Sequence, residues 1–170
     1  SHISLAGAEI ELVEMENRTM GLRASLLKVK PKYDFVIIDC PPSLGLITVN
    51  ALAASDSILI PIQCEYYALE GLSQLISTVR TVKRMYNSDI EVEGVLLTMY
   101  DSRLNLTVQV VDEVKKYFAD KIFTTVVPRN VRLSEAPSFG QPIMYFDKAS
   151  KGAEAYLSLS KEIIKNNKKK

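Results

Sequence analysis

The chain has 170 residues, of which 47% are hydrophobic and 24% charged, and its formal net charge is +1. This length suits one domain, and the balanced charge gives no overall attraction to nucleic acid or to an anionic membrane. No apolar run approaches the ~20 residues of a membrane span. The chain opens on neither a signal peptide nor an initiator methionine, which suggests a piece of a longer protein.

Residues 3–30 favour two helices. The first is predicted from Ile3 to about Glu14. The second follows the stretch "ENRT", with Thr19 as its expected N-cap, and its apolar residues share one face. Cys40 and Cys64 are the only cysteines, too few for a disulfide framework, and each ends an apolar run. We expect both to be small buried thiols in a reducing cytosol.

From residue 35 onward, short apolar runs alternate with helical patterns. The predicted strands are Phe35–Asp39, Ser57–Ile62, Val92–Met99 and Ile122–Val127. The predicted helices are Leu46–Ala54, Ala68–Tyr86, Leu106–Ala119 and Lys151–Lys165. Strands that are apolar on both faces and alternate with helices predict an α/β fold, with a parallel sheet flanked by helices on both faces. We expect one domain over residues 1–170.

Ligands of such sheets bind beyond the carboxyl ends of the strands, which directs attention to Asp39. A carboxylate at the tip of a buried strand costs free energy unless it is compensated. A hydrated Mg²⁺ beside phosphates is one such compensation, as for the acidic Walker B residue of P-loop NTPases. Pro41 and Pro42 would then turn the chain away and leave the site open. The alternative is that Asp39 caps the following helix.

The partner of a Walker B carboxylate is a phosphate-binding loop, G-x-x-x-x-G-K-[ST], whose N–H groups and lysine hold the phosphates. The 170 residues do not contain this motif. The chain as given therefore has no phosphate cradle, and we expect it to be inactive as an ATPase on its own.

Several long blocks nevertheless carry a specific resemblance. They are "LAGAEIELV", "YDFVIIDCPPSLGLITVNAL", "ASDSILIPIQCEYYALEGLSQL", "VEGVLLTMYDSR", "VPRNVRLSEAPSFGQPI" and "SKGAEAYLSL". In this order they resemble the C-terminal two thirds of a ParA/Soj-type partitioning ATPase, a deviant-Walker P-loop family. The resemblance implies a P-loop NTPase-like fold whose first strand, phosphate loop, catalytic lysine and switch-region acid would lie upstream of Ser1.

The resemblance also implies roles for five residues. Asp39 matches the Walker B position, which holds Mg²⁺ through water beside ATP. Pro128 and Asn130 match the loop that packs around the nucleotide base. Arg103 and Arg132 match the positions that contact DNA. From the residues alone, these two arginines could equally be solvated surface side chains, although Arg is well suited to phosphate.

The family implies a cytoplasmic, nucleoid-associated protein that forms a homodimer around ATP. The dimer binds double-stranded DNA without sequence preference, and a ParB-type centromere-binding partner stimulates hydrolysis. The stretch "SEAPSFGQPI" is expected to be a loop at the rim of the base site.

Two alternatives remain open. One is a non-catalytic interaction or regulatory fragment that cannot bind ATP alone. The other is a relative of the division-site positioning ATPase that sits on membranes, because the tail "LSKEIIKNNKKK" could form a short basic amphipathic helix. The "PRNVRLSEAP" block favours partitioning proteins, and no membrane partner is expected.

Overall fold

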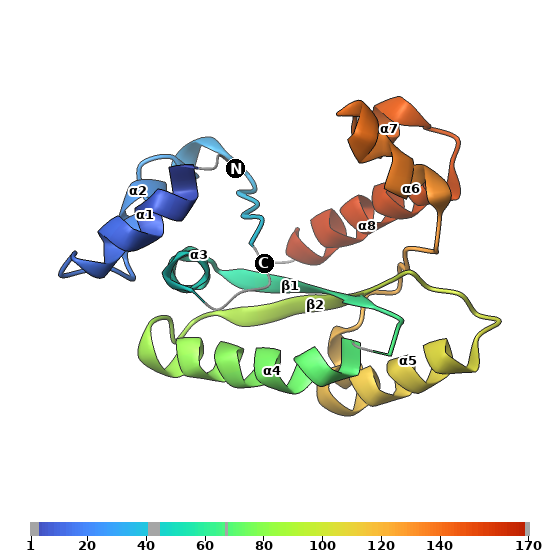
Figure 1. The fold of residues 1–170 in the computed structure, drawn as a ribbon, viewed down its shortest axis with the longest axis horizontal. Helices are drawn as coiled ribbons and strands as arrows, with labels where there is room; N and C mark the ends of the chain where they lie inside the picture. The colour runs from blue at the N-terminus through green and yellow to red at the C-terminus, as the bar shows by residue number, and fades with distance from the viewer. Residues whose placement is uncertain (1–3, 41–44, 67, 169–170) are drawn as a thin grey trace. The chain divides into compact units, whose positions relative to one another are not determined.

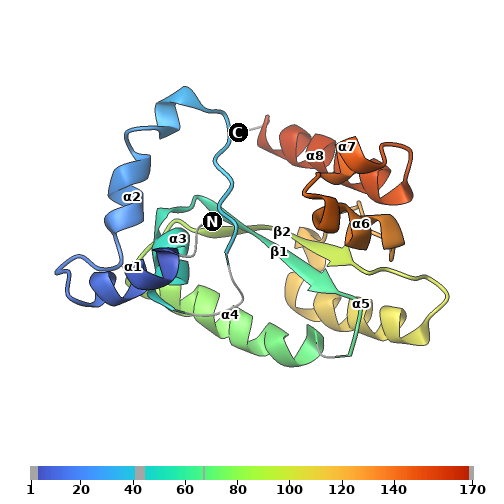
Figure 2. The same ribbon diagram turned by 45° about the horizontal axis from the view of Figure 1, so that its top comes forward.

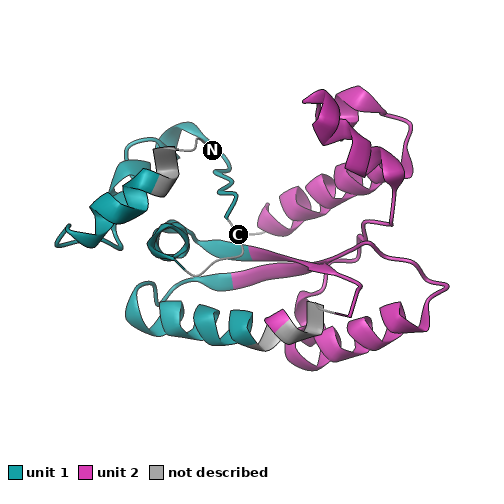
Figure 3. Ribbon diagram, in the orientation of Figure 1, with its two compact units in different colours: residues 1–58, 74–91 teal, residues 59–73, 92–170 magenta. Residues whose placement is uncertain are grey.

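The structure is a computed structural model that describes residues 4–40, 45–66 and 68–168. It divides into two compact units, coloured separately in Figure 3. Unit 1 comprises residues 1–58 and 74–91, and unit 2 comprises residues 59–73 and 92–170. Each unit is described by itself below.

Unit 1 is mainly helical. Its helices are α1 (Ser4–Val13), α2 (Gly21–Leu26), α3 (Leu46–Ala54) and the greater part of α4 (Ala68–Met85). The buried side chain of Asn50 joins α2 to α3, because its Nδ2 donates to the Arg18 carbonyl at 2.6 Å while its Oδ1 accepts from the Leu22 N–H at 3.3 Å. The predicted cap of α2 was wrong: Met20 occupies the N-cap position, and no side chain caps the helix there.

The predicted strand Phe35–Asp39 is not formed. Residues 35–40 have no regular secondary structure, and the exposed fraction of Ile37 reaches 92%. A strand forms only where a neighbouring strand pairs with its N–H and C=O groups. Within the described ranges, no backbone hydrogen bond joins residues 35–40 to another strand. For the same reason Cys40 is exposed rather than buried. Pro41 and Pro42 lie outside the described residues.

The described sheet contains β1 (Ser57–Gln63) and β2 (Glu91–Thr98), which are connected through α4 (Figure 1). The two strands are parallel, because Glu91 N–H donates to Asp56 O where they begin and Cys64 N–H donates to Thr98 O where they end. Cys64 is buried as predicted, and burial raises the pKa of its thiol to about 11. The parallel α/β arrangement predicted from the alternating pattern is therefore present.

The fourth predicted strand, Ile122–Val127, is present only in part. It runs parallel to β2 but is joined to the sheet through two isolated bridges, Val95 with Ile122 and Tyr100 with Pro128. Between the bridges, the N–H groups of Thr124 and Thr125 donate to the Glu162 carboxylate at 2.7 and 2.9 Å instead of to a strand. Because these N–H groups bind Glu162, the hydrogen bonding between residues 122–127 and β2 is interrupted.

Two helices cover the opposite faces of the strands in unit 2. They are α5 (Asn105–Phe118) and α8 (Lys151–Asn167), and Figures 1 and 2 show them on either side of β2. Leu96 packs with Leu159 of α8 in a cluster of buried hydrophobic residues. Its neighbours Val95 and Leu97 point to the other face, since side chains alternate along a strand. The α5 residues Val110 and Val114 are completely buried.

The stretch "SEAPSFGQPI", predicted to be a loop, is largely helical. Short α6 (Val131–Glu135) continues into a 3₁₀ turn at Ala136–Phe139, and α7 (Ile143–Phe146) follows. Gly140 separates the turn from α7 with φ of 62°, a left-handed conformation that glycine adopts without strain. Proline is well tolerated at the start of such turns, which is why Pro137 does not prevent helical structure here.

Candidate nucleic-acid interface and nucleotide residues

The loop after β2 is held against the loop that follows residue 127. The Tyr100 N–H donates to Val127 O at 3.1 Å, and the Arg129 N–H donates to Tyr100 O at 3.2 Å. Immediately before this contact, Met99 has φ of 52°, and it is the one non-glycine residue with positive φ in the described part of the chain. Left-handed backbone is strained for such a residue and is concentrated at functional loops. The contact brings the predicted DNA loop and the predicted base loop side by side.

Arg103 lies in the first of these loops, and one edge of its guanidinium is bound by Asp101. Its Nε donates to Asp101 Oδ1 at 2.9 Å and its Nη2 to Oδ2 at 2.7 Å, while its backbone N–H also donates to Oδ1 at 3.1 Å. These hydrogen bonds hold the pKa of Asp101 down to about 2. The Arg103 side chain is 84% exposed, so its free edge faces solvent.

Arg132 lies on α6 and is engaged by two carboxylates. Its Nη1 donates to Glu135 at 2.9 Å, and its Nε lies 3.2 Å from Asp147. Its guanidinium carbon also lies over the Phe146 ring, 6.0 Å from the ring centre. Glu135 makes the largest contribution to raising the pKa of Arg132. Because the side chain is 56% exposed, phosphate could still reach it.

Pro128 and Asn130 lie between Arg103 and Arg132 in the sequence, and all four residues belong to unit 2. Pro128 forms the bridge to Tyr100, and Asn130 is the N-cap of α6, where its Oδ1 accepts from the Arg132 N–H at 2.9 Å. The residue between them, Arg129, forms an ion pair with Glu65 at the end of β1. The structure therefore gathers Arg103, Pro128 and Asn130 on connected loops, with Arg132 on the helix α6 that follows, and their roles stay predictions.

The carboxylate partners of these arginines were not predicted. The spacing of Arg132 and Glu135, three apart on a helix, is a signal that could have indicated that pair. No local spacing indicates Asp147, the C-cap residue of α7, whose Oδ2 lies 3.2 Å from Arg132 Nε. Glu65 was interpreted only as a helix-entry carboxylate, whereas it contacts Arg129.

Asp39 belongs to unit 1 and is exposed. In the described residues, no group of three or more His, Cys, Asp or Glu side chains could hold a metal ion. A single exposed carboxylate does not make a magnesium site, since Mg²⁺ takes a near-octahedral set of oxygen ligands. The residues described here therefore do not by themselves fit Mg²⁺, and the role of Asp39 stays a prediction.

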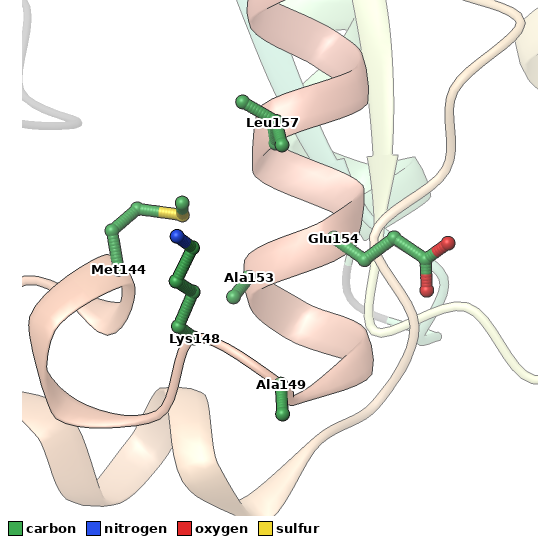
Figure 4. Close-up of a pocket in the computed structure, with 6 residues that line it drawn as sticks. All are labelled: Met144, Lys148, Ala149, Ala153, Glu154 and Leu157. Carbon is green, nitrogen blue, oxygen red and sulfur yellow. The ribbon is translucent and has the colours of Figure 1, made fainter.

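A shallow pocket of about 290 Å³ lies elsewhere in unit 2, beside the start of α8 (Figure 4). Met144 and Lys148 reach toward one another on one side, while the Glu154 carboxylate points away. Its other lining residues are Ala149, Ala153 and Leu157. The lining is mostly apolar and contains none of the predicted site residues, so it adds nothing to the case for catalysis.

Comparisons with known proteins agree with the resemblance. A family model described as "AAA domain" matches residues 1–92. The chain is 63% identical over 164 residues to the sporulation initiation inhibitor protein Soj of Bacillus subtilis (strain 168), covering 96% of this chain and 65% of that protein. It is 59% identical over 163 residues to the chromosome partitioning protein ParA of Myxococcus xanthus (strain DK1622), covering 96% and 58%.

Among solved structures, a cobyrinic acid a,c-diamide synthase from Mycobacterium smegmatis with bound ATP analog and magnesium superposes with a TM-score of 0.81. It is 33% identical, and the match covers 99% of this chain and 62% of that one. The parallel sheet with flanking helices is thus P-loop NTPase-like.

The chain belongs to the ParA/Soj-type family of partitioning ATPases. It spans 58% to 65% of the length of the two curated relatives described above. Along the described ranges, none of its helices combines the length and the apolar character that crossing a bilayer requires.

Proposed function

We propose that this chain is part of a ParA/Soj-like ATPase that segregates DNA through ATP-dependent dimerisation and non-specific DNA binding. A ParB-type partner stimulates hydrolysis, and the protein acts in the cytoplasm on the nucleoid. The identity of 63% and 59% to Soj and ParA, extending over 96% of the chain in each case, carries this proposal. Residues 1–170 form the C-terminal part of a single ATPase domain.

The proposal gives each predicted residue a role. Arg103 and Arg132 bind phosphates of the DNA backbone, which gives affinity that depends on salt and not on sequence. Pro128 and Asn130 contact the nucleotide base, and Asp39 holds Mg²⁺ through water. The hydrogen bonds between the loops that follow β2 and residue 127 support the proposal, because they keep base and DNA residues on one connected surface.

ATP binding is proposed for the whole protein and not for these residues alone, because they contain no phosphate loop. The second candidate function, a non-catalytic interaction module, is favoured by one observation. Residues 35–40, which would carry Asp39 at a strand tip, form no strand and are largely exposed.

ATPase assays separate these two functions. We expect no hydrolysis by the 170-residue chain and DNA-stimulated or partner-stimulated hydrolysis by a form extended upstream to include a phosphate loop. In the extended form, Asp39→Asn should abolish magnesium-dependent turnover. An extended form that binds no ATP would instead establish the interaction module.

DNA binding by the form extended upstream, with ATP present, is tested on short duplexes of unrelated sequence at low and moderate salt. We expect Arg103→Gln and Arg132→Gln to weaken binding to all duplexes alike, and each to lower the salt dependence by about one phosphate contact. Arg80→Gln, an exposed residue of α4 with the same loss of charge, is the control. Equal DNA binding by the parent and by both arginine variants would reject Arg103 and Arg132 as a DNA-binding surface.

A further inference from the structure

The arginines proposed to bind phosphate are already occupied by carboxylates of the same chain. Arg103 presents its Nε and Nη2 to both oxygens of Asp101. This pair of parallel N–H groups is the same edge that makes the two-point contact with a phosphate. A phosphate must therefore either displace Asp101 from Nε and Nη2 or bind to the edge of the guanidinium that Asp101 does not occupy.

Arg132 is more heavily occupied. Arg132 Nη1 donates a hydrogen bond to Glu135, and the Asp147 carboxylate lies beside Nε. Carboxylates therefore lie on two sides of the guanidinium. One positive charge faces two negative charges in this cluster. The ring of Phe146 lies over the guanidinium and itself stacks on Phe139 with centres 5.0 Å apart, which holds α7 and Asp147 in this place.

The charges of the ion-paired groups around these arginines indicate what an approaching phosphate meets there. Three arginines, Arg103, Arg129 and Arg132, are matched by four carboxylates, Asp101, Glu65, Glu135 and Asp147. With all seven groups ionised, the set carries a net charge of −1. A surface that binds DNA normally presents a positive potential to it.

We propose that Asp101, Glu135 and Asp147 are intramolecular competitors of the DNA phosphates and set the affinity of this surface. The inference rests on the proposed function, in which Arg103 and Arg132 contact DNA. Duplex DNA binds by replacing these carboxylates on the arginines, and the released carboxylates remain nearby as like charges. As a consequence, the surface binds DNA weakly and releases it readily, although the N–H groups of Arg103 and Arg132 could otherwise bind phosphates strongly.

The test removes carboxylate charge and leaves the arginines intact. Asp101→Asn and Asp147→Asn retain side-chain shape, and binding to a short fluorescent duplex is measured by anisotropy at low salt. We expect each variant to bind about fivefold more tightly, the effect of one charge at contact distance in water. The gain should shrink at high salt, where screening is stronger.

The matched control is Asp112→Asn on α5. Asp112 is likewise a carboxylate in an ion pair, with Lys115 at 3.9 Å, although it is more exposed than Asp101 and Asp147, and its removal changes the net charge equally. An equal gain in Asp112→Asn would overturn the inference, because total charge would then explain the effect. Unchanged or weaker binding by Asp101→Asn and Asp147→Asn would also overturn it, since the carboxylates would then orient the arginines for DNA.

Glu135→Gln is the second variant for the Arg132 cluster, because it leaves Asp147 and α7 in place. It should tighten binding in the same direction. Arg103→Gln and Arg132→Gln test the DNA-binding role separately from the competitor role. If these variants lose DNA binding while the carboxylate variants bind like the parent, the arginines bind DNA and the carboxylates are not competitors. If the arginine variants bind DNA like the parent, both roles are rejected.

Discussion

The Asn130 side chain accepts a hydrogen bond from the Arg132 backbone N–H at 2.9 Å, so a proposed base-contacting residue caps the helix that carries a proposed DNA-contacting residue. The first N–H groups of a helix have no partner within the helix, and a cap supplies one. The position of Arg132 on short α6 therefore depends on the conformation of Asn130.

Replacing this cap should loosen α6. We expect Asn130→Ala to cost about 1 kcal/mol in the free energy of unfolding, because an alanine leaves the N–H of Arg132 without its acceptor. Asn130→Ser restores a capping oxygen and should recover most of the loss. Urea denaturation measures the stability, and hydrogen exchange at the Arg132 amide measures the local effect. Equal exchange rates in the alanine and serine variants would show that the cap is unimportant.

Glu162 should give the chain an acid-sensitive contribution to stability. Burial of its carboxyl acts to raise the pKa, but the hydrogen bonds from Thr125 and Thr124 together outweigh it and lower the pKa. A carboxyl whose pKa is lower in the folded state stabilises the fold above its unfolded pKa, about 4.3 for Glu. That contribution is lost as the pH falls through the folded pKa, because protonation weakens both acceptors.

Glu162→Gln should therefore destabilise the chain at neutral pH by about 1 kcal/mol, a value kept small because the carboxylate is partly exposed. The difference from the parent should shrink as the pH is lowered below 4.3. Denaturant unfolding at pH 7 and at acid pH measures it. Glu154→Gln, on the exposed side of the same helix, should have little effect at either pH. A difference that grows on acidification would contradict the prediction.

Gly94 is required by the close approach of Phe123. A Cβ at position 94 would lie 2.5 Å from Cε2 of the Phe123 ring, and Gly94 is buried in β2. We expect Gly94→Ala to cost about 1–3 kcal/mol through overpacking. Gly71→Ala on α4 meets no atom within 4 Å and should instead stabilise the helix by up to about 1 kcal/mol. Thermal or urea unfolding of both variants checks the opposite signs.

Asp101 should stay ionised at every pH well above 2. Its pKa is held to about 2 by the hydrogen bonds from Arg103, so its interaction with Arg103 is present above the unfolded value of about 3.9 and is lost only as the pH falls through about 2. A carbon-detected NMR titration of the Asp101 carboxyl should show no midpoint above pH 3 in the parent. In Arg103→Gln the midpoint should move back toward the unfolded value. A midpoint near 4 in the parent would mean that the ion pair is absent in solution.

The sequence predicted the elements that local pattern controls. Helices α3, α4, α5 and α8 lie within about two residues of their expected limits. In α4, α5 and α8 the apolar residues repeat at helical spacing, which is the local pattern that predicts them. The strand Phe35–Asp39 was wrong for a different reason. Its composition is suited to a strand, but a strand also needs a partner, and pairing is not a local property.

The candidate surface likewise combines features that the sequence indicates with features that depend on tertiary contacts. Arg103 and Arg132 were selected through the family resemblance, and the structure places Arg103 in the loop after β2 and Arg132 on α6. The partner of Arg103 is local, at Asp101, whereas Asp147 could not be predicted as a partner of Arg132 because it lies beyond another helix. Glu65 likewise reaches Arg129 from a distant part of the sequence. The left-handed conformation of Met99 likewise follows from the contact between two loops and carries no signal in the residue type.

The ion pairs of Arg132 change how charge-reversal mutagenesis should be interpreted in this family. Replacing Arg132 by glutamate would place a third carboxylate between Glu135 and Asp147, where repulsion would force α6 and α7 apart. Loss of DNA binding in such a variant would combine a missing contact with local unfolding. Neutral substitutions, judged beside a variant that also removes Asp147, separate these two effects.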